Sequence, residues 1–186
     1  MATAGVRPAT PADVAEIARI QADTWETAYS GLVPAAAIAH LRGEAAQQAW
    51  TSAVEAGTGH VLVALEGTWT VGFCAAAPAV APEGVTGPVD VTLGPEAWGE
   101  VGTLLVEPRW GRRGHGGRLL AAAAAALRGA GAIYGLAWVP EADAASRGFY
   151  ARAGWEPDGT VRVLDTGDGE LREVRVTGSL DLKLQE

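Results

Sequence analysis

The sequence predicts a mixed α/β (α+β) fold, in which one mixed sheet carries helices on both faces. Two observations favour it. Through the middle of the chain, short apolar runs with strand character alternate with longer segments of helix-forming residues. The last part of the chain instead has the pattern of two strands joined by a turn at 166–169. No repeat or linker interrupts the 186 residues, so we expect a single domain that spans 1–186.

The first half of the chain begins with a capped helix. Thr10 has N-cap character, Pro11 suits the first helical position, and apolar residues at helical spacing continue to about Tyr29. Gly31 and Pro34 then end the helix. The other elements expected in this half are a strand at 6–8, a helical region at 35–56 that breaks near Gly43, and a hairpin of strands 60–66 and 70–77.

The second half opens with a segment rich in proline and glycine, 78–99, which holds a strand-like run at 89–93. A connection of this length is uncommon in a compact domain unless it has a function or is disordered. The elements expected after it are a central strand at 97–106, a helix at 116–128, a strand at 133–139, a helix at 142–153, and an antiparallel pair at 155–163 and 171–184.

The composition disfavours several classes of protein. A formal net charge of -8 argues against a nucleic-acid partner, since nucleic-acid binders present a basic face. Cys74 is the single cysteine and the histidines lack metal-ligand spacing, so we expect neither a disulfide nor a metal site. No apolar run approaches the roughly 20 residues that span a bilayer, and the start lacks a signal-peptide pattern. We therefore expect a cytoplasmic protein with no membrane partner.

A basic, glycine-rich turn precedes the helix at 116–128. Its glycines let backbone amides converge on a ligand, and the helix directs its unpaired amides and positive dipole end at the same point, as in phosphate sites. Cations at a helix N-terminus oppose the dipole, so a bound anion explains them better than a solvated helix start. These cations are Arg109, Arg112, Arg113 and Arg118. Two known phosphate loops do not fit. A P-loop needs Gly-Lys followed by Ser or Thr, but here Gly117 is followed by Arg118 and Leu119. A dinucleotide fingerprint needs a third glycine where this chain has Leu119.

The turn Gly111-Arg112-Arg113-Gly114-His115-Gly116, preceded by 104–108, resembles motif A of the GNAT superfamily of acyl-CoA-dependent N-acyltransferases. It departs from that motif at Gly111, where Gln or Arg is usual. The stretch 143–155, with Ser146, Phe149-Tyr150 and Gly154-Trp155, is similar to motif B of the same family, although Asp143 replaces the usual Asn. The resemblance covers nearly the whole chain and implies a GNAT fold, with a mostly antiparallel sheet that splays between the motif A strand and the next strand.

The resemblance implies acetyl-CoA as co-substrate, with no metal. The turn would hold the pyrophosphate through backbone amides and charge, and the backbone of the central strand would pair with the pantetheine arm. The amide of Val106 would polarise the thioester carbonyl. The residues implied in cofactor binding are Leu104, Leu105, Val106, Arg112, Arg113, Gly114, His115, Gly116, Gly117 and Ser146.

Catalysis in this family is direct transfer, and Tyr150 matches the tyrosine that donates a proton to the departing thiolate. Glu100 stands where many relatives carry the glutamate that takes the proton of the amine. A position at an exposed strand end would explain Glu100 equally. Asp90 and Glu26 are the other candidates for this role, with less support. At the end of the first helix, Trp25, Glu26 and Tyr29 are the implied acceptor-binding residues, against simple core packing of the two aromatic residues. Asp143 is expected to serve as a helix N-cap.

The function expected is therefore an N-acetyltransferase that transfers an acetyl group from acetyl-CoA to a primary amine of a small molecule, with the acidic surface favouring a cationic acceptor. Alternatives stay open: a non-catalytic acyl-CoA-binding module, acetylation of a protein N-terminus or lysine, or a longer acyl donor. The segment 78–99 either covers the acceptor site or is a plain connecting loop. Dimers are common in the superfamily, so a homodimer is also open.

Overall fold

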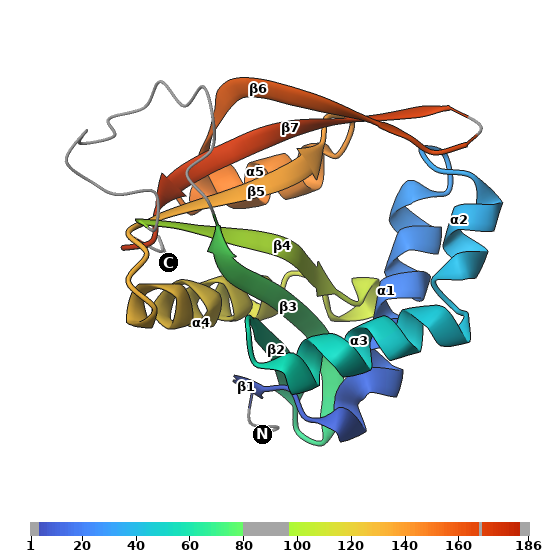
Figure 1. The fold of residues 1–186 in the computed structure, drawn as a ribbon, viewed down its shortest axis with the longest axis horizontal. Coiled ribbons are helices and arrows are strands. Elements are labelled where there is room, and N and C mark those ends of the chain that lie inside the picture. Colours follow the sequence, from blue (N-terminus) through green and yellow to red (C-terminus); the bar gives the residue numbers. More distant parts are fainter. Residues whose placement is uncertain (1–3, 80–96, 168, 183–186) are drawn as a thin grey trace.

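The computed structural model describes residues 4–79, 97–167 and 169–182, whose strands form one seven-stranded sheet (Figure 1). The strand order is β1-β2-β3-β4-β5-β7-β6, and only the pair β4 and β5 among these described strands is parallel. The strands are β1 (Ala4–Pro8), β2 (His60–Glu66), β3 (Trp69–Ala79), β4 (Trp98–Val106), β5 (Tyr134–Pro140), β6 (Glu156–Asp165) and β7 (Glu170–Ser179). The mixed, mostly antiparallel sheet is thus confirmed.

The sheet opens between β4 and β5. The two strands pair from Trp98 opposite Tyr134 to Glu100 opposite Leu136, and beyond that point they diverge, as Figure 1 shows. On its other edge β4 stays paired with β3 as far as Val106. Within the described part of the chain, the peptide groups of β4 after Glu100 therefore lack a strand partner on the side that faces β5. The splay expected from the resemblance is confirmed.

Helices cover both faces of the sheet because adjacent residues of a strand point to opposite sides. Phe73 of β3 packs with Ile17 and Ile20 of α1 (Val14–Tyr29), and α3 (Glu44–Ala56) lies on the same face. The next residue, Cys74, belongs instead to the core formed with Leu119 of α4 (His115–Gly129). α5 (Ala144–Arg152) adds its Tyr150 to that second core. Each fully buried aliphatic side chain contributes about 1.5–3 kcal/mol to the free energy of folding.

Most element boundaries agree with the sequence predictions, including the break in the second helical region between α2 (Ala35–His40) and α3. Between Thr10 and α1 lies a single turn, η1 (Pro11–Asp13), so the α-helix itself begins later than the cap pattern suggests. The last strand was expected to reach 184, but β7 ends at Ser179 because its partner β5 begins at Tyr134, directly opposite. The strand-like run at 89–93 and Asp90 lie outside the described residues.

Candidate active site

Gly114 precedes the first residue of α4 and has a backbone conformation that residues with a side chain rarely adopt. Gly114 is the N-cap, with a φ of 81° in the left-handed region. The first hydrogen bond of the helix runs from the amide of Arg118 to the carbonyl of Gly114, at 3.0 Å. The amides of His115, Gly116 and Gly117 therefore precede the hydrogen-bonded part of the helix. Together with the positive end of the dipole they suit an anion.

A groove of about 530 Å³ runs from this helix start along β4 and α5. Arg112 and Arg152 line it, and none of its described lining residues is acidic. At its floor, an added Cβ on Gly116 would lie 3.2 Å from the Phe149 ring, so glycine at this position lets α5 pack close to α4. Trp110 also lines the groove, and its buried indole N–H has no hydrogen-bond partner among the described residues. The lining is thus suited to an anionic ligand with polar groups along its length.

Two predicted turn residues make other contacts. Arg113 does not line the groove; its guanidinium stacks over Trp110, at 4.9 Å from the ring centroid, and lies 3.9 Å from the Glu66 carboxylate. His115 lines the groove but is 1% exposed, with its Nε2 2.8 Å from a carboxylate oxygen of Glu66. The side chains of Arg113 and His115 therefore contact Glu66 of β2, while the glycines of the turn line the groove.

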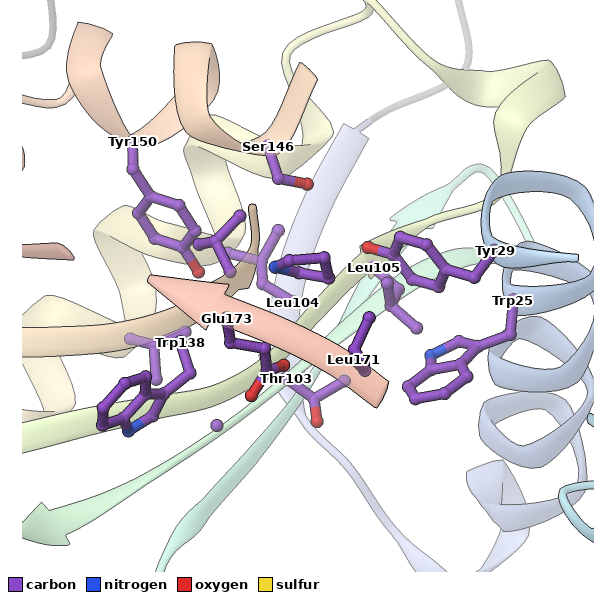
Figure 2. A pocket seen from close by; sticks show the side chains of 14 residues that line it. Trp25, Tyr29, Thr103, Leu104, Leu105, Trp138, Ser146, Tyr150, Leu171 and Glu173 are labelled. Carbon is purple, nitrogen blue, oxygen red and sulfur yellow. The ribbon is translucent and has the colours of Figure 1, made fainter. Parts of the chain in front are cut away.

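A second, smaller pocket of about 90 Å³ lies where β4 and β5 have parted (Figure 2). Residues 101–105 of β4 form one wall. Figure 2 shows Trp25 and Tyr29 of α1 on one side, Tyr150 and Trp138 on the other, and Glu173 of β7 between them. The walls are largely aromatic and apolar, and Glu173 is the one charged residue among the described residues that line the pocket.

The groove and the pocket meet at Tyr150, since both are lined by Leu104, Ser146 and Tyr150. Tyr150 is 6% exposed, and its ring stacks on Trp155 with centroids 5.4 Å apart. Burial raises the pKa of its hydroxyl well above the ordinary value of 10. The phenol is therefore protonated at neutral pH and can donate a proton at the junction of the two hollows.

Asp143 fixes the start of α5 and joins it to α1. Its carboxylate accepts hydrogen bonds from the Ser146 amide (2.9 Å), the Ser146 hydroxyl (2.7 Å) and the Tyr29 hydroxyl (2.8 Å). Burial acts to raise the pKa of Asp143, but these hydrogen bonds outweigh it and hold the pKa below its ordinary value. Burial, then Asp143, also raises the pKa of Tyr29. The expected N-cap role of Asp143 is confirmed, and the same contacts place Ser146 and Tyr29 at the pocket.

The structure brings most of the predicted site residues together, but two glutamates lie elsewhere. Leu105, Trp25 and Tyr29 line the pocket, whereas Val106 lines the groove. Glu26 is exposed on the outer face of α1, with its carboxylate 2.6 Å from the Arg42 guanidinium. Glu100 lines a third hollow, which adjoins the pocket at Gly102 and includes His60.

Sequence reasoning missed Glu173, Trp138 and Trp110. The alternating pattern of β7 indicates one buried face, on which Glu173 lies with Leu171 and Arg175, and all three residues are buried. A terminal strand with alternating charges is more typical of a solvated face, so the pattern alone did not indicate a pocket.

The fold, the phosphate-type helix start and the two adjoining hollows are those of a CoA-dependent acyltransferase. The family model described as acetyltransferase (GNAT) family matches residues 15–155, so this chain belongs to that family. No curated protein sequence matches it. In the described part of the chain, no cluster of three or more potential metal ligands occurs. No described helix is long and apolar enough to cross a membrane.

Solved structures share the fold at low sequence identity. The PaiA N-acetyltransferase of Thermoplasma acidophilum, in complex with coenzyme A, superimposes with a TM-score of 0.72 at 15% identity, over 93% of this chain and 98% of its own. The putative acetyltransferase YncA of Salmonella typhimurium, with acetyl-CoA, gives 0.68 at 19% identity, over 96% and 94%. The ribosomal-protein-alanine N-acetyltransferase of Brucella melitensis gives 0.71 at 20% identity, over 94% and 99%.

Proposed function

We propose that this chain transfers an acetyl group from acetyl-CoA to a primary amine of a small molecule. The observation that carries the proposal is the meeting of a large groove and a small pocket at Tyr150. The groove has the helix start and cations that a pyrophosphate needs, and the pocket has room for a small amine. A thioester bound at the junction lies next to the groove, which holds the rest of the cofactor, and next to the pocket, which holds the amine.

In the proposed reaction the amine attacks the thioester carbonyl directly. The carbon–nitrogen bond forms as the carbon–sulfur bond breaks, the nitrogen gives up a proton, and the leaving sulfur takes one from Tyr150. The unpaired peptide groups of β4, including the Val106 amide, pair with the pantetheine arm and polarise the carbonyl. Glu100 is the proposed proton acceptor, and because it lines the adjoining hollow the proton reaches it through water.

Calorimetric titration with acetyl-CoA tests the cofactor. Gly114→Glu places bulk and negative charge at the helix start, so we expect it to abolish binding. Gly57→Glu is the matched control, since Gly57 also has a positive φ, of 64°, but has no atom within 4 Å of an added Cβ and lies away from the groove. Equal loss in both variants would mean that backbone strain, not the site, caused the effect.

Thiol release from acetyl-CoA with a panel of primary amines tests the reaction. Tyr150→Phe removes the proton donor and should lower kcat by roughly 10²-fold or more, while acetyl-CoA still binds. Undiminished turnover in Tyr150→Phe would exclude the proposed role of Tyr150. Binding of acetyl-CoA without thiol release for any amine would favour a non-catalytic acyl-CoA-binding module.

A second candidate acceptor is the N-terminal amine of a protein. The similarity to the Brucella melitensis ribosomal-protein-alanine N-acetyltransferase favours including it. A peptide with a free N-terminal alanine and the same peptide with a blocked N-terminus separate the two candidates. Release of thiol with the free peptide alone, and with no small amine, would replace the first proposal by the second.

A further inference from the structure

Glu173 is a buried carboxylate that faces the small pocket. It is 8% exposed and lies on β7 opposite Pro140 of β5 and Arg162 of β6. The other described residues that line the pocket carry no formal charge. Burying an ionised group is costly unless partners compensate it, so the contacts of this carboxylate decide what the pocket can accept.

One partner is Arg162, whose Nε donates to Oε2 of Glu173 at 2.6 Å. Arg162 does not line the pocket; its side chain is 41% exposed, and its guanidinium lies over the Trp138 ring at 4.4 Å. The pair therefore points its negative end inward and its positive end toward solvent. The remaining oxygen, Oε1, has no hydrogen-bond partner in the described part of the chain.

The neighbouring charged groups are already paired. Arg175 lies beside Glu173 on the same face of β7 and forms a buried ion pair with Asp158, at 2.6 Å. Asp143 accepts its hydrogen bonds from Ser146 and Tyr29. Glu173 is thus the group that gives the pocket its charge, and that charge is negative.

Aromatic and carboxylate groups together bind ammonium ions, because a cation is attracted both to the carboxylate and to the faces of the rings. Trp25 and Tyr29 supply the rings here, whereas the Trp138 ring already carries the guanidinium groups of Arg162 and Arg175, at 4.4 and 5.7 Å from its centroid. The pocket volume of about 90 Å³ has room for an ammonium group on a short chain.

We infer that Glu173 binds the ammonium group of the acceptor, so that the substrates are small primary amines that are cationic at neutral pH. This inference rests on the proposed function, of which it names the substrate class. Glu173 is a binding residue in this account: it positions the nitrogen of the acceptor, the ammonium gives one proton to water before attack, and the neutral amine then reacts as proposed above.

The test is an NMR titration of the CoA-bound protein with butylammonium chloride at pH 7, followed by the indole N–H signals of the tryptophans. Butan-1-ol, of the same shape but uncharged, is the ligand control. We expect native protein to bind butylammonium at least about tenfold more tightly than butan-1-ol. Glu173→Gln should abolish that difference. Glu141→Gln, which breaks an exposed ion pair with Arg172 next to Glu173 in the strand, should leave it unchanged.

A second variant changes the affinity in the opposite direction. Arg162→Gln removes the compensating cation, so the affinity for butylammonium should rise about threefold or more. Retained CoA binding shows that each variant is folded. Equal affinities for the ammonium and the alcohol in native protein, or an unchanged preference in Glu173→Gln, would overturn the inference.

These outcomes do not depend on turnover. The titration uses CoA and not acetyl-CoA, so it reports ammonium binding even if no acetyl group is transferred. Absence of thiol release with the amine panel would count against the proposed function alone, whereas loss of the charge preference would count against Glu173 alone.

Discussion

Gly178→Ala should destabilise the protein by wedging a methyl group against the Trp155 indole. An added Cβ at Gly178 would lie 2.3 Å from Cδ1 of that ring. Gly135 is the cross-strand partner of Gly178, and a Cβ there would lie 2.3 Å from Cη2 at the other end of the ring. The two glycines thus leave a surface without side chains across β5 and β7, and the indole packs against it.

The ring has little freedom to move away. Trp155 is fully buried, its Nε1 donates to the Ser179 carbonyl at 3.1 Å, and its other neighbour is the stacked Tyr150 ring. To restore an ordinary van der Waals distance between the added methyl and the ring, the indole must shift by about 1 Å. Overpacking of this kind lowers the free energy of unfolding by about 1–3 kcal/mol. Because the shift passes to Tyr150, we also expect kcat to fall while acetyl-CoA binding changes less.

Urea unfolding measures the cost, with Gly5→Ala as control because an added Cβ at Gly5 meets no atom within 4 Å. A double-mutant cycle gives the sharper test. In a Trp155→Ala background the added methyl enters the space left by the indole and keeps only its 3.0 Å approach to the Gly154 carbonyl, so Gly178→Ala should cost at least about 0.5 kcal/mol less there than in the native background. An equal cost in both backgrounds would refute the explanation.

Three further outcomes are expected. The Arg7 side chain, through two hydrogen bonds, lowers the pKa of Asp13 from 3.8 to about 2, so this carboxylate contributes stability above its unfolded pKa that is lost as pH falls toward 2. The destabilisation by Asp13→Asn, at most about 2 kcal/mol at pH 7, should thus shrink in urea melts below pH 4, and a pH-independent difference would exclude this account. Asp158→Ala removes the carboxylate that lies 2.6 Å from the buried Arg175, whose hydrogen bond to Thr160 stays, and the loss of this charged hydrogen bond should cost about 1.5–3 kcal/mol in the same melts, more than breaking a surface pair. Burial raises the pKa of the Cys74 thiol to about 12, so Ellman's reagent should label Cys74 at pH 8 only after unfolding; rapid labelling of folded protein would contradict that burial.

Local patterns predicted most of the fold because they depend on residues close in sequence. The alternation of strand and helix character, the proline and glycine breaks, and the cap at Asp143 each involve a short window. The end of the last strand could not be predicted in this way. It depends on where β5 begins, which is a contact between Tyr134 and Ser179.

The site residues also divide into those that local sequence patterns predict and those that depend on contacts between distant segments. The helix start at Gly114 and the position of Tyr150 on α5 are local features, and the sequence carried both. The pocket between β4 and β5 is assembled from segments far apart in the chain, as the hydrogen bond from Tyr29 to Asp143 illustrates.

Glu173 shows why charge in a sequence does not by itself reveal a binding group. Its strand neighbours Arg172 and Arg175 are equally charged, yet Arg172 is exposed and pairs with Glu141, whereas Arg175 is buried against Asp158. What singles out Glu173 is that β4 and β5 part beside it, which opens a pocket, and that Arg162 reaches it from the solvent side. The same carboxylate in a fully paired sheet would be one more member of an ion-pair network. The divergence of two strands, and not the residue type, turns it into the charged group that faces the pocket.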